Sequence, residues 1–248
     1  MNGVILYEGP SLLDGAPVVA IATGLKGKSR NEKTGDMVQT WILRADVAPH
    51  EAIHTGEDAS VCGDCPHRGR IEDGRNVGRS CYVTTFQAPL SVWKAYRRGL
   101  YPAVSREDVA TLFAGRMVRL GSYGDPAAIP VDVWQNAVAR ASGWTGYTHQ
   151  WRTAPRALAA LCMASVETDG QARAARLQGW RTFRVRAEGQ PLAPKLEFIC
   201  PASAEAGMKT DCASCRACMG TESKAKASPV IIAHGAGRRA ASALAMAA

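Results

Sequence analysis

The sequence predicts an α/β fold built around a mainly parallel sheet, and two observations lead to it. Short β-branched runs recur through the second half of the chain, separated by amphipathic stretches with helical periodicity. Hydrophobic residues make up 46% of the chain, which suffices for one sizeable core. Strands that alternate with helices form βαβ crossovers, and roughly eight strands close a barrel. The first choice is a (β/α) barrel-like fold, which can be irregular or incompletely closed. A doubly wound open sheet is the alternative.

In the first half, residues 17–23 (PVVAIAT) and 38–44 (VQTWILR) predict strands, because β-branched and aromatic side chains are frequent in them. Residues 1–15 are punctuated by Gly and Pro, and residues 24–36 are polar, so both predict irregular structure. Residues 48–80 lack periodicity and predict a long loop of the kind that usually carries function.

The rest of the chain predicts alternating elements. Further strands or extended segments are expected at residues 81–86, 116–121, 145–148, 161–166, 181–185, 196–200 and 230–233. Helices are expected from apolar residues at helical spacing at residues 90–100, 130–142, 155–160 and 171–178. Together these elements predict a single domain over residues 1–235, with metal-binding loops at 61–82 and 200–219. A flexible Ala-rich tail is expected at residues 236–248.

The net charge of +8 favours an anionic partner, either a small molecule or nucleic acid. The basic residues are scattered along the chain, which does not favour a dedicated nucleic-acid stripe.

No apolar run approaches the roughly 18 residues that a membrane-spanning helix needs, so no membrane partner is expected. No export signal is visible, so a cytoplasmic location is expected. The oligomeric state is left open.

Seven of the eight cysteines fall into two groups with metal-ligand spacing, which is the most specific signal in the sequence. The second group contains Cys212, Cys215 and Cys218, spaced C-x2-C-x2-C, and Cys200, which precedes a proline. Bacterial ferredoxins hold a 4Fe–4S cluster with such a run and a remote Cys-Pro. Structural zinc bound by the same four thiolates is the first alternative. Disulfide bonds between the cysteines are the second.

The first group, Cys62, Cys65 and Cys81, supplies only three thiolates. It could leave one iron of a second 4Fe–4S cluster open to substrate or cofactor, or take His67 as a fourth ligand, which would equally suit zinc. The predicted cofactor is therefore one 4Fe–4S cluster or two, with zinc as the alternative. Cys162 lies within a strand pattern and is expected to be a core thiol.

Polar residues stand just after several predicted strands, where α/β barrels place their working groups. Asp125, His149 and Glu167 are the candidate catalytic residues, because such side chains bind substrates or move protons. Asp169, Cys200 and His234 occupy similar positions. The alternative for Asp125 is that it merely caps the helix beginning near Pro126 or Pro130.

The motif series VCGDCPHRG, RSCYV, GSYGDP, GYTHQW, FICPAS, TDCASCRAC and VIIAHG resembles a group of phage and prophage proteins, the Gp88-like set. The resemblance implies a phage or mobile-element origin and a barrel-like fold with cysteine-bound metal, but no established reaction. The first thiol group also looks distantly like the C-x3-C-x2-C arrangement of radical S-adenosylmethionine enzymes. Its own spacing is C-x2-C-x15-C, and no glycine-rich S-adenosylmethionine motif is present.

The leading prediction is an iron–sulfur protein of phage type, an enzyme of redox or radical type that acts on an anionic substrate. The alternative is a zinc-stabilised, basic nucleic-acid-binding protein of phage replication or host takeover, in the cytoplasm of a bacterial host. A third reading is a metal-stabilised interaction module without catalysis.

Overall fold

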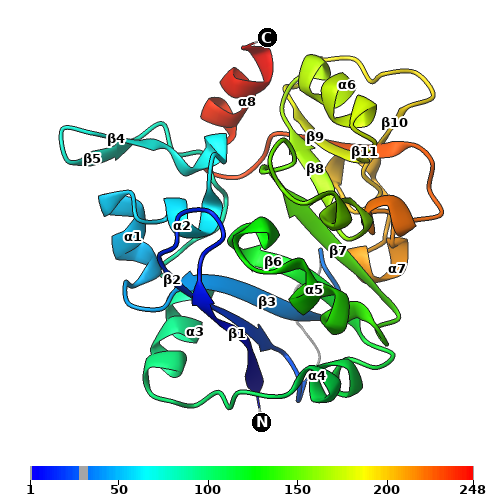
Figure 1. Ribbon diagram of the computed structural model, residues 1–248. Coiled ribbons are helices and arrows are strands. Elements are labelled where there is room, and N and C mark those ends of the chain that lie inside the picture. The colour runs from blue at the N-terminus through cyan, green and yellow to red at the C-terminus, as the bar shows by residue number, and fades with distance from the viewer. Residues whose placement is uncertain (1, 28–32, 248) are drawn as a thin grey trace.

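A nine-stranded sheet organises the computed structural model, which describes residues 2–27 and 33–247 (Figure 1). Its strand order is β1-β2-β3-β6-β7-β8-β9-β11-β10. These strands are β1 (Gly3–Pro10), β2 (Pro17–Thr23), β3 (Met37–Arg44), β6 (Met117–Tyr123), β7 (Gly143–Thr148), β8 (Met163–Val166), β9 (Thr182–Arg186), β10 (Glu197–Ile199) and β11 (Ser228–Ile232). β1, β2 and β3 pair antiparallel, and all pairs from β3 to β10 are parallel. The predicted α/β class is therefore confirmed.

Helices and a small hairpin connect these strands. The α-helices are α1 (Pro49–Thr55), α2 (Ala59–Cys62), α3 (Ala88–Arg97), α4 (Arg106–Leu112), α5 (Val131–Val138), α6 (Asp169–Leu177), α7 (Cys212–Cys215) and α8 (Arg238–Met246). The 3-10 helices are η1 (Pro66–Arg68), η2 (Pro126–Ala128), η3 (Arg156–Ala160), η4 (Ala204–Ala206) and η5 (Gly220–Glu222). β4 (Arg70–Glu72) and β5 (Arg75–Val77) form the hairpin. None of the helices among the described residues is long and apolar enough to cross a bilayer.

The order of the strands determines where the connections lie. From β6 to β9 the sheet order follows the chain order, so right-handed crossovers place α5 and α6 on one face. β11 lies between β9 and β10, so the order reverses at the end of the sheet. A right-handed return from β10 to β11 crosses the opposite face. β1 and β10 are the two edges of the sheet as described.

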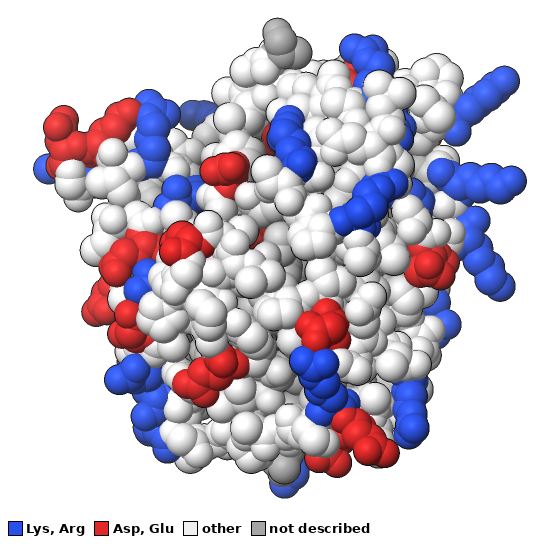
Figure 2. All heavy atoms as spheres, in the orientation of Figure 1, with Lys and Arg blue, Asp and Glu red and all other residues white. Residues whose placement is uncertain are grey.

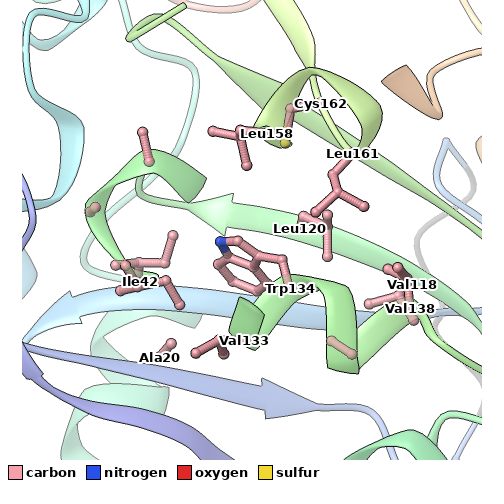
Figure 3. Packing of buried hydrophobic residues seen from close by; sticks show 14 of the residues in the cluster. Ala20, Ile42, Val118, Leu120, Val133, Trp134, Val138, Leu158, Leu161 and Cys162 are labelled. Atoms are coloured by element: carbon pink, nitrogen blue, oxygen red, sulfur yellow. The ribbon is translucent and has the colours of Figure 1, made fainter. Parts of the chain in front are cut away.

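The main core lies between the sheet and the connecting helices. Trp134 of α5 is fully buried and donates its indole N–H to the Pro126 carbonyl, 2.8 Å away. Figure 3 shows it among side chains from other elements, including Ile42 of β3 and Leu120 of β6. Cys162 is fully buried in the same cluster, which confirms its prediction as a core thiol.

Two segments expected to be irregular are ordered. Residues 1–15 contain β1, because an edge strand tolerates a terminal proline, and Pro10 pairs in register with Pro17. Residues 48–80 contain α1, α2, η1 and the β4–β5 hairpin rather than one loop. α1 has Pro49 in its first turn and ends at Gly56, whose φ of 85° suits glycine.

Two further expectations differ from the structure. Residues 81–86 form no strand, because the Ser80 and Cys81 amides donate to the His67 carbonyl instead of to a neighbouring strand. The tail expected to be flexible contains α8, whose Ala241 and Ala245 are buried. Residues 28–32 of the predicted polar loop, and residue 248 of the tail, lie outside the described residues.

Candidate metal centre and cavity

A cavity of about 440 Å³ lies on the sheet face opposite α5 and α6. Successive side chains of a strand point to opposite faces. On β6, Val118 and Leu120 pack into the core with Trp134, whereas Arg119 between them lines the cavity. The same alternation continues across the sheet. The cavity floor includes Arg119, Thr145, Tyr147, Ser165, Phe183, Val185 and Ile231.

Both cysteine groups face this one cavity, although they are far apart in the chain. The cysteines that line it are Cys62, Cys65, Cys81, Cys200, Cys212, Cys215 and Cys218. The first group comes from α2 and the segments that follow it. The second lies in the return connection between β10 and β11, the connection expected to cross the face opposite the helices.

A tight turn shapes the first group. Gly63 has a φ of 54°, and a Cβ there would lie 2.5 Å from the Gln150 carboxamide. Gln150 donates from Nε2 to the Cys62 carbonyl at 3.2 Å, which ties the turn to the end of β7. The Cys65 amide donates to the Cys62 carbonyl at 3.2 Å. Cys81 joins them because its amide binds the carbonyl of His67 at 2.9 Å.

Hydrogen bonds to backbone groups also hold the second group in place. The Asp211 carboxylate accepts from the Ser214 amide at 2.8 Å and so caps α7, in which two of the cysteines lie. The Cys218 carbonyl accepts from the Gly146 amide of β7 at 3.4 Å. The Arg181 guanidinium donates to the carbonyls of Ala217, Gly220 and Ala227 at 2.8, 3.0 and 2.6 Å. The loop is therefore fixed against the sheet.

Burial disfavours ionisation of several of these thiols. It raises the pKa of Cys218 to about 12, although a hydrogen bond with Tyr147 lowers it and the neighbouring thiolates raise it further. Burial also raises the pKa of Cys62 well above its usual value, with a contribution from Cys65. A metal ligand must be a thiolate, so metal binding at these cysteines has to release protons.

The separation of the sulfurs bears on which metal they could hold. Four thiolates around one zinc ion lie about 3.8 Å apart, given Zn–S bonds of about 2.3 Å. Among the described residues, no three cysteine sulfurs lie within 4.8 Å of one another. A 4Fe–4S cluster binds each thiolate through a different iron and so takes more widely spaced sulfurs. The described cysteine sulfurs are therefore not at the spacing of a single-ion site.

The candidate catalytic residues come together at the carboxyl ends of β6, β7 and β8, as their sequence positions predict. Asp125 and His149 line the cavity, together with the first cysteine group. Glu167 is buried beside them, and its Oε1 lies 2.9 Å from Nε2 of His149. Asp169 does not join them, because it pairs with Arg173 within α6. His234 lines the cavity but contacts Lys33 and Tyr82.

Both carboxylate oxygens of Asp125 accept hydrogen bonds from backbone amides. Its Oδ1 accepts from the Ala127 amide at 3.0 Å, and its Oδ2 accepts from the His149 amide at 2.8 Å. Burial raises the pKa of Asp125 even though these hydrogen bonds and one from Thr148 lower it. Its amide donates to the Val61 carbonyl at 2.6 Å, next to Cys62. Asp125 therefore caps η2 and also positions His149.

His149 and Glu167 favour each other's charged forms. Burial opposes a charge on His149, but Cys65 and Glu167 outweigh it and raise the pKa of His149 well above its usual value. Burial likewise opposes a charge on Glu167, but hydrogen bonds from His149 and His67 lower the pKa of Glu167 to about 2. The two side chains are therefore paired at the edge of the cavity.

The two ring nitrogens of His67 already have protein partners. Nε2 lies 3.3 Å from Glu167 Oε1, and Nδ1 lies 2.7 Å from Ser80 Oγ. A role for His67 as the fourth ligand of the first cysteine group would require one of these contacts to break.

Arg119 is the main cavity residue that the sequence reasoning missed. Its Nη2 donates to the Tyr82 hydroxyl at 2.9 Å, while its Nε is buried without a hydrogen-bond partner among the described residues. The sequence did contain a signal for it, because Arg119 is a charged residue between apolar neighbours in a predicted strand. Buried arginines are rare unless they are paired.

Comparison of the chain with protein-family models, with curated proteins and with solved structures finds no match. The resemblance to the Gp88-like set therefore stays a prediction.

Proposed function

We propose that this protein is an iron–sulfur enzyme of redox or radical type that acts on a small anionic substrate. The observation that carries the proposal is that seven cysteines from two distant segments line a single cavity. In this proposal Cys200, Cys212, Cys215 and Cys218 hold one 4Fe–4S cluster, which would supply electron transfer. Cys62, Cys65 and Cys81 hold a second cluster, with one iron open towards the cavity.

Several features of the cavity support an anionic substrate. Arg119 lies on the cavity floor, where its guanidinium could pair with a carboxylate or phosphate. The lining also has an apolar part, including Phe183, Val185 and Ile231, which suits the body of a small molecule. A cavity of about 440 Å³ holds a metabolite but not a nucleic-acid duplex.

The polar end of the cavity would carry the proton chemistry. His149 and Glu167 form a buried pair that can move a proton or bind substrate, and Asp125 positions His149 through its backbone. The one-directional, parallel strand order from β6 to β9 supports an incomplete barrel as the scaffold, because right-handed crossovers then keep α5 and α6 on one face. The motif resemblance supports a phage-type origin.

The test is anaerobic purification followed by iron and acid-labile sulfide analysis. We expect a brown protein containing iron and sulfide in similar amounts. Cys215→Ala should lose most of the iron at its site, because loss of one of four ligands degrades a cluster. Cys162→Ala is the matched control, since Cys162 lies in the core and lines no part of the cavity. It should keep its full iron content.

Two results would overturn the proposal. One is a colourless wild-type protein that contains zinc and no sulfide, which would favour the zinc-stabilised alternative. The other is an equal content of iron and sulfide in wild type and Cys215→Ala.

A further inference from the structure

Two histidines and one glutamate converge beside the first cysteine group. Nε2 of His67 and Nε2 of His149 both approach Oε1 of Glu167, at 3.3 and 2.9 Å. The three ligand atoms all lie within 4.8 Å of one another. His67 comes from η1 and the other two from the ends of β7 and β8, so this convergence depends on the tertiary fold.

Two of the three distances match those between ligands of one metal ion, and the third is within 4.8 Å. Bonds of about 2.0 to 2.2 Å from zinc to nitrogen or oxygen place neighbouring ligands about 3.0 to 3.5 Å apart. The two nitrogen–oxygen distances, 2.9 and 3.3 Å, lie at or close to this range. An ion could therefore replace the present contacts with little movement of the three side chains.

The surroundings orient the ligands as the second shell of a metal site does. Ser80 Oγ lies 2.7 Å from Nδ1 of His67, which leaves Nε2 as the coordinating atom. The Asp125 carboxylate holds the backbone of His149, and Glu167 is only 4% exposed. Both histidines line the cavity, so the remaining coordination positions of an ion would face it.

We infer that His67, His149 and Glu167 form a mononuclear site for a divalent first-row transition metal. Two histidines and one carboxylate, with open positions, are the ligand set of non-haem Fe²⁺ sites and of catalytic zinc sites. The inference goes beyond the proposed iron–sulfur function, because it uses none of the cysteines; with the ion bound, His149 and Glu167 are its ligands, and the proton role proposed above belongs to the metal-free pair. It places a substrate-facing metal ion next to the first cysteine group, which lines the same cavity.

The experiment is a Co²⁺ titration of the anaerobically purified full chain, followed by visible and near-ultraviolet absorption. Co²⁺ bound to imidazole and carboxylate gives weak visible bands, whereas thiolate ligands add an intense near-ultraviolet charge-transfer band. We expect about one Co²⁺ per chain with the nitrogen–oxygen signature. His67→Gln and Glu167→Gln should each weaken its binding at least ~10-fold, the scale already seen for loss of outer-shell partners.

His234→Gln is the matched control, because His234 lines the same cavity but contacts Lys33 and Tyr82. It should bind Co²⁺ as wild type does. His67 is 13% exposed at its side chain and Glu167 is 5% exposed, so His67→Gln remains informative if Glu167→Gln does not fold. The site does not exist if wild type shows no nitrogen–oxygen signature, or if folded His67→Gln binds Co²⁺ as tightly as wild type.

Sulfide analysis of the same samples separates this inference from the proposed function. Wild type without sulfide that still binds Co²⁺ through nitrogen and oxygen would retain the metal site and overturn the clusters. Wild type that contains sulfide but lacks this Co²⁺ signature would retain the clusters and overturn the metal site.

Discussion

At the scale of single residues, Asp125 shows how one buried carboxylate fixes the backbone on which neighbouring chemistry depends. Its two oxygens accept from the amides of Ala127 and His149. An asparagine has nearly the same shape but only one acceptor oxygen, so one of the two amides would face an NH₂ group.

We therefore expect Asp125→Asn to lower the free energy of unfolding by about 1–3 kcal/mol, the cost of an unsatisfied buried polar group. Urea unfolding followed by circular dichroism measures this. Asp169→Asn is the control, because Asp169 pairs with Arg173 at the surface of α6, where an ion pair contributes little. Unchanged stability of Asp125→Asn, with activity lost, would instead mean that Asp125 acts directly on a ligand.

The sequence placed Asp125, His149 and Glu167 together because each follows a predicted parallel strand, and such strand ends meet at one edge. It could not place His67 beside them. His67 belongs to a segment without periodicity, and its position depends on tertiary contacts such as that with Ser80. Arg119 was missed for a related reason, since only its neighbours across the sheet show which face of β6 lines a cavity.

At the scale of elements, a buried ion pair joins the end of the sheet to α6. Glu197 of β10 accepts from Arg184 of β9 at 2.9 and 2.6 Å, and Arg176 of α6 lies 3.0 Å away. β11 runs between β9 and β10, so the pair spans three strands. Burial opposes the charge on Glu197, but Arg184 outweighs it and lowers the pKa of Glu197 below its usual value.

Glu197→Gln should destabilise the protein by about 3–5 kcal/mol at pH 7, because it leaves the buried Arg184 without its counter-charge. Since the pKa is lowered on folding, the unfolded chain binds more protons in acid. The contribution of Glu197 is present above the usual carboxyl pKa, about 4.3, and is lost as the pH falls through its lower folded pKa. Urea unfolding of both proteins from pH 7 to about pH 3 should show their difference shrinking. A difference that does not change with pH would contradict this account.

The elements found from the sequence are those with a strong local pattern. β2 and β3 are hydrophobic runs and were predicted within a residue or two. β1 was missed because Gly and Pro obscure an edge strand whose order comes from pairing with β2. The short α2 and α7 have four residues each, too few for periodicity to show.

At the scale of the whole molecule, the positive charge is dispersed. Figure 2 shows several separate Lys and Arg side chains along the right-hand edge of the visible face, while most Asp and Glu side chains lie on its left and lower parts. With a net charge of +8, the protein still attracts polyanions over long range.

We expect only weak, sequence-indifferent binding to nucleic acid, lost between about 50 and 200 mM salt as phosphate contacts release counterions. Fluorescence anisotropy with labelled single-stranded oligonucleotides of two unrelated sequences measures it. Tight binding that discriminates between the sequences at physiological salt would favour the nucleic-acid-binding alternative over an enzyme.

The strand order at the end of the sheet has a consequence for biosynthesis. β10 hydrogen-bonds to β11 and to no other described strand, and β11 is the last of the described strands in chain order. A chain emerging from the ribosome can form β1 to β9 in sequence, but β10 and the cysteines after it have no partner until β11 follows. The first cysteine group is translated well before the second group, with which it lines the cavity. In the proposed function, a cluster at the shared cavity would therefore have to form after β11 has been made, because only then is the second cysteine group held against the sheet.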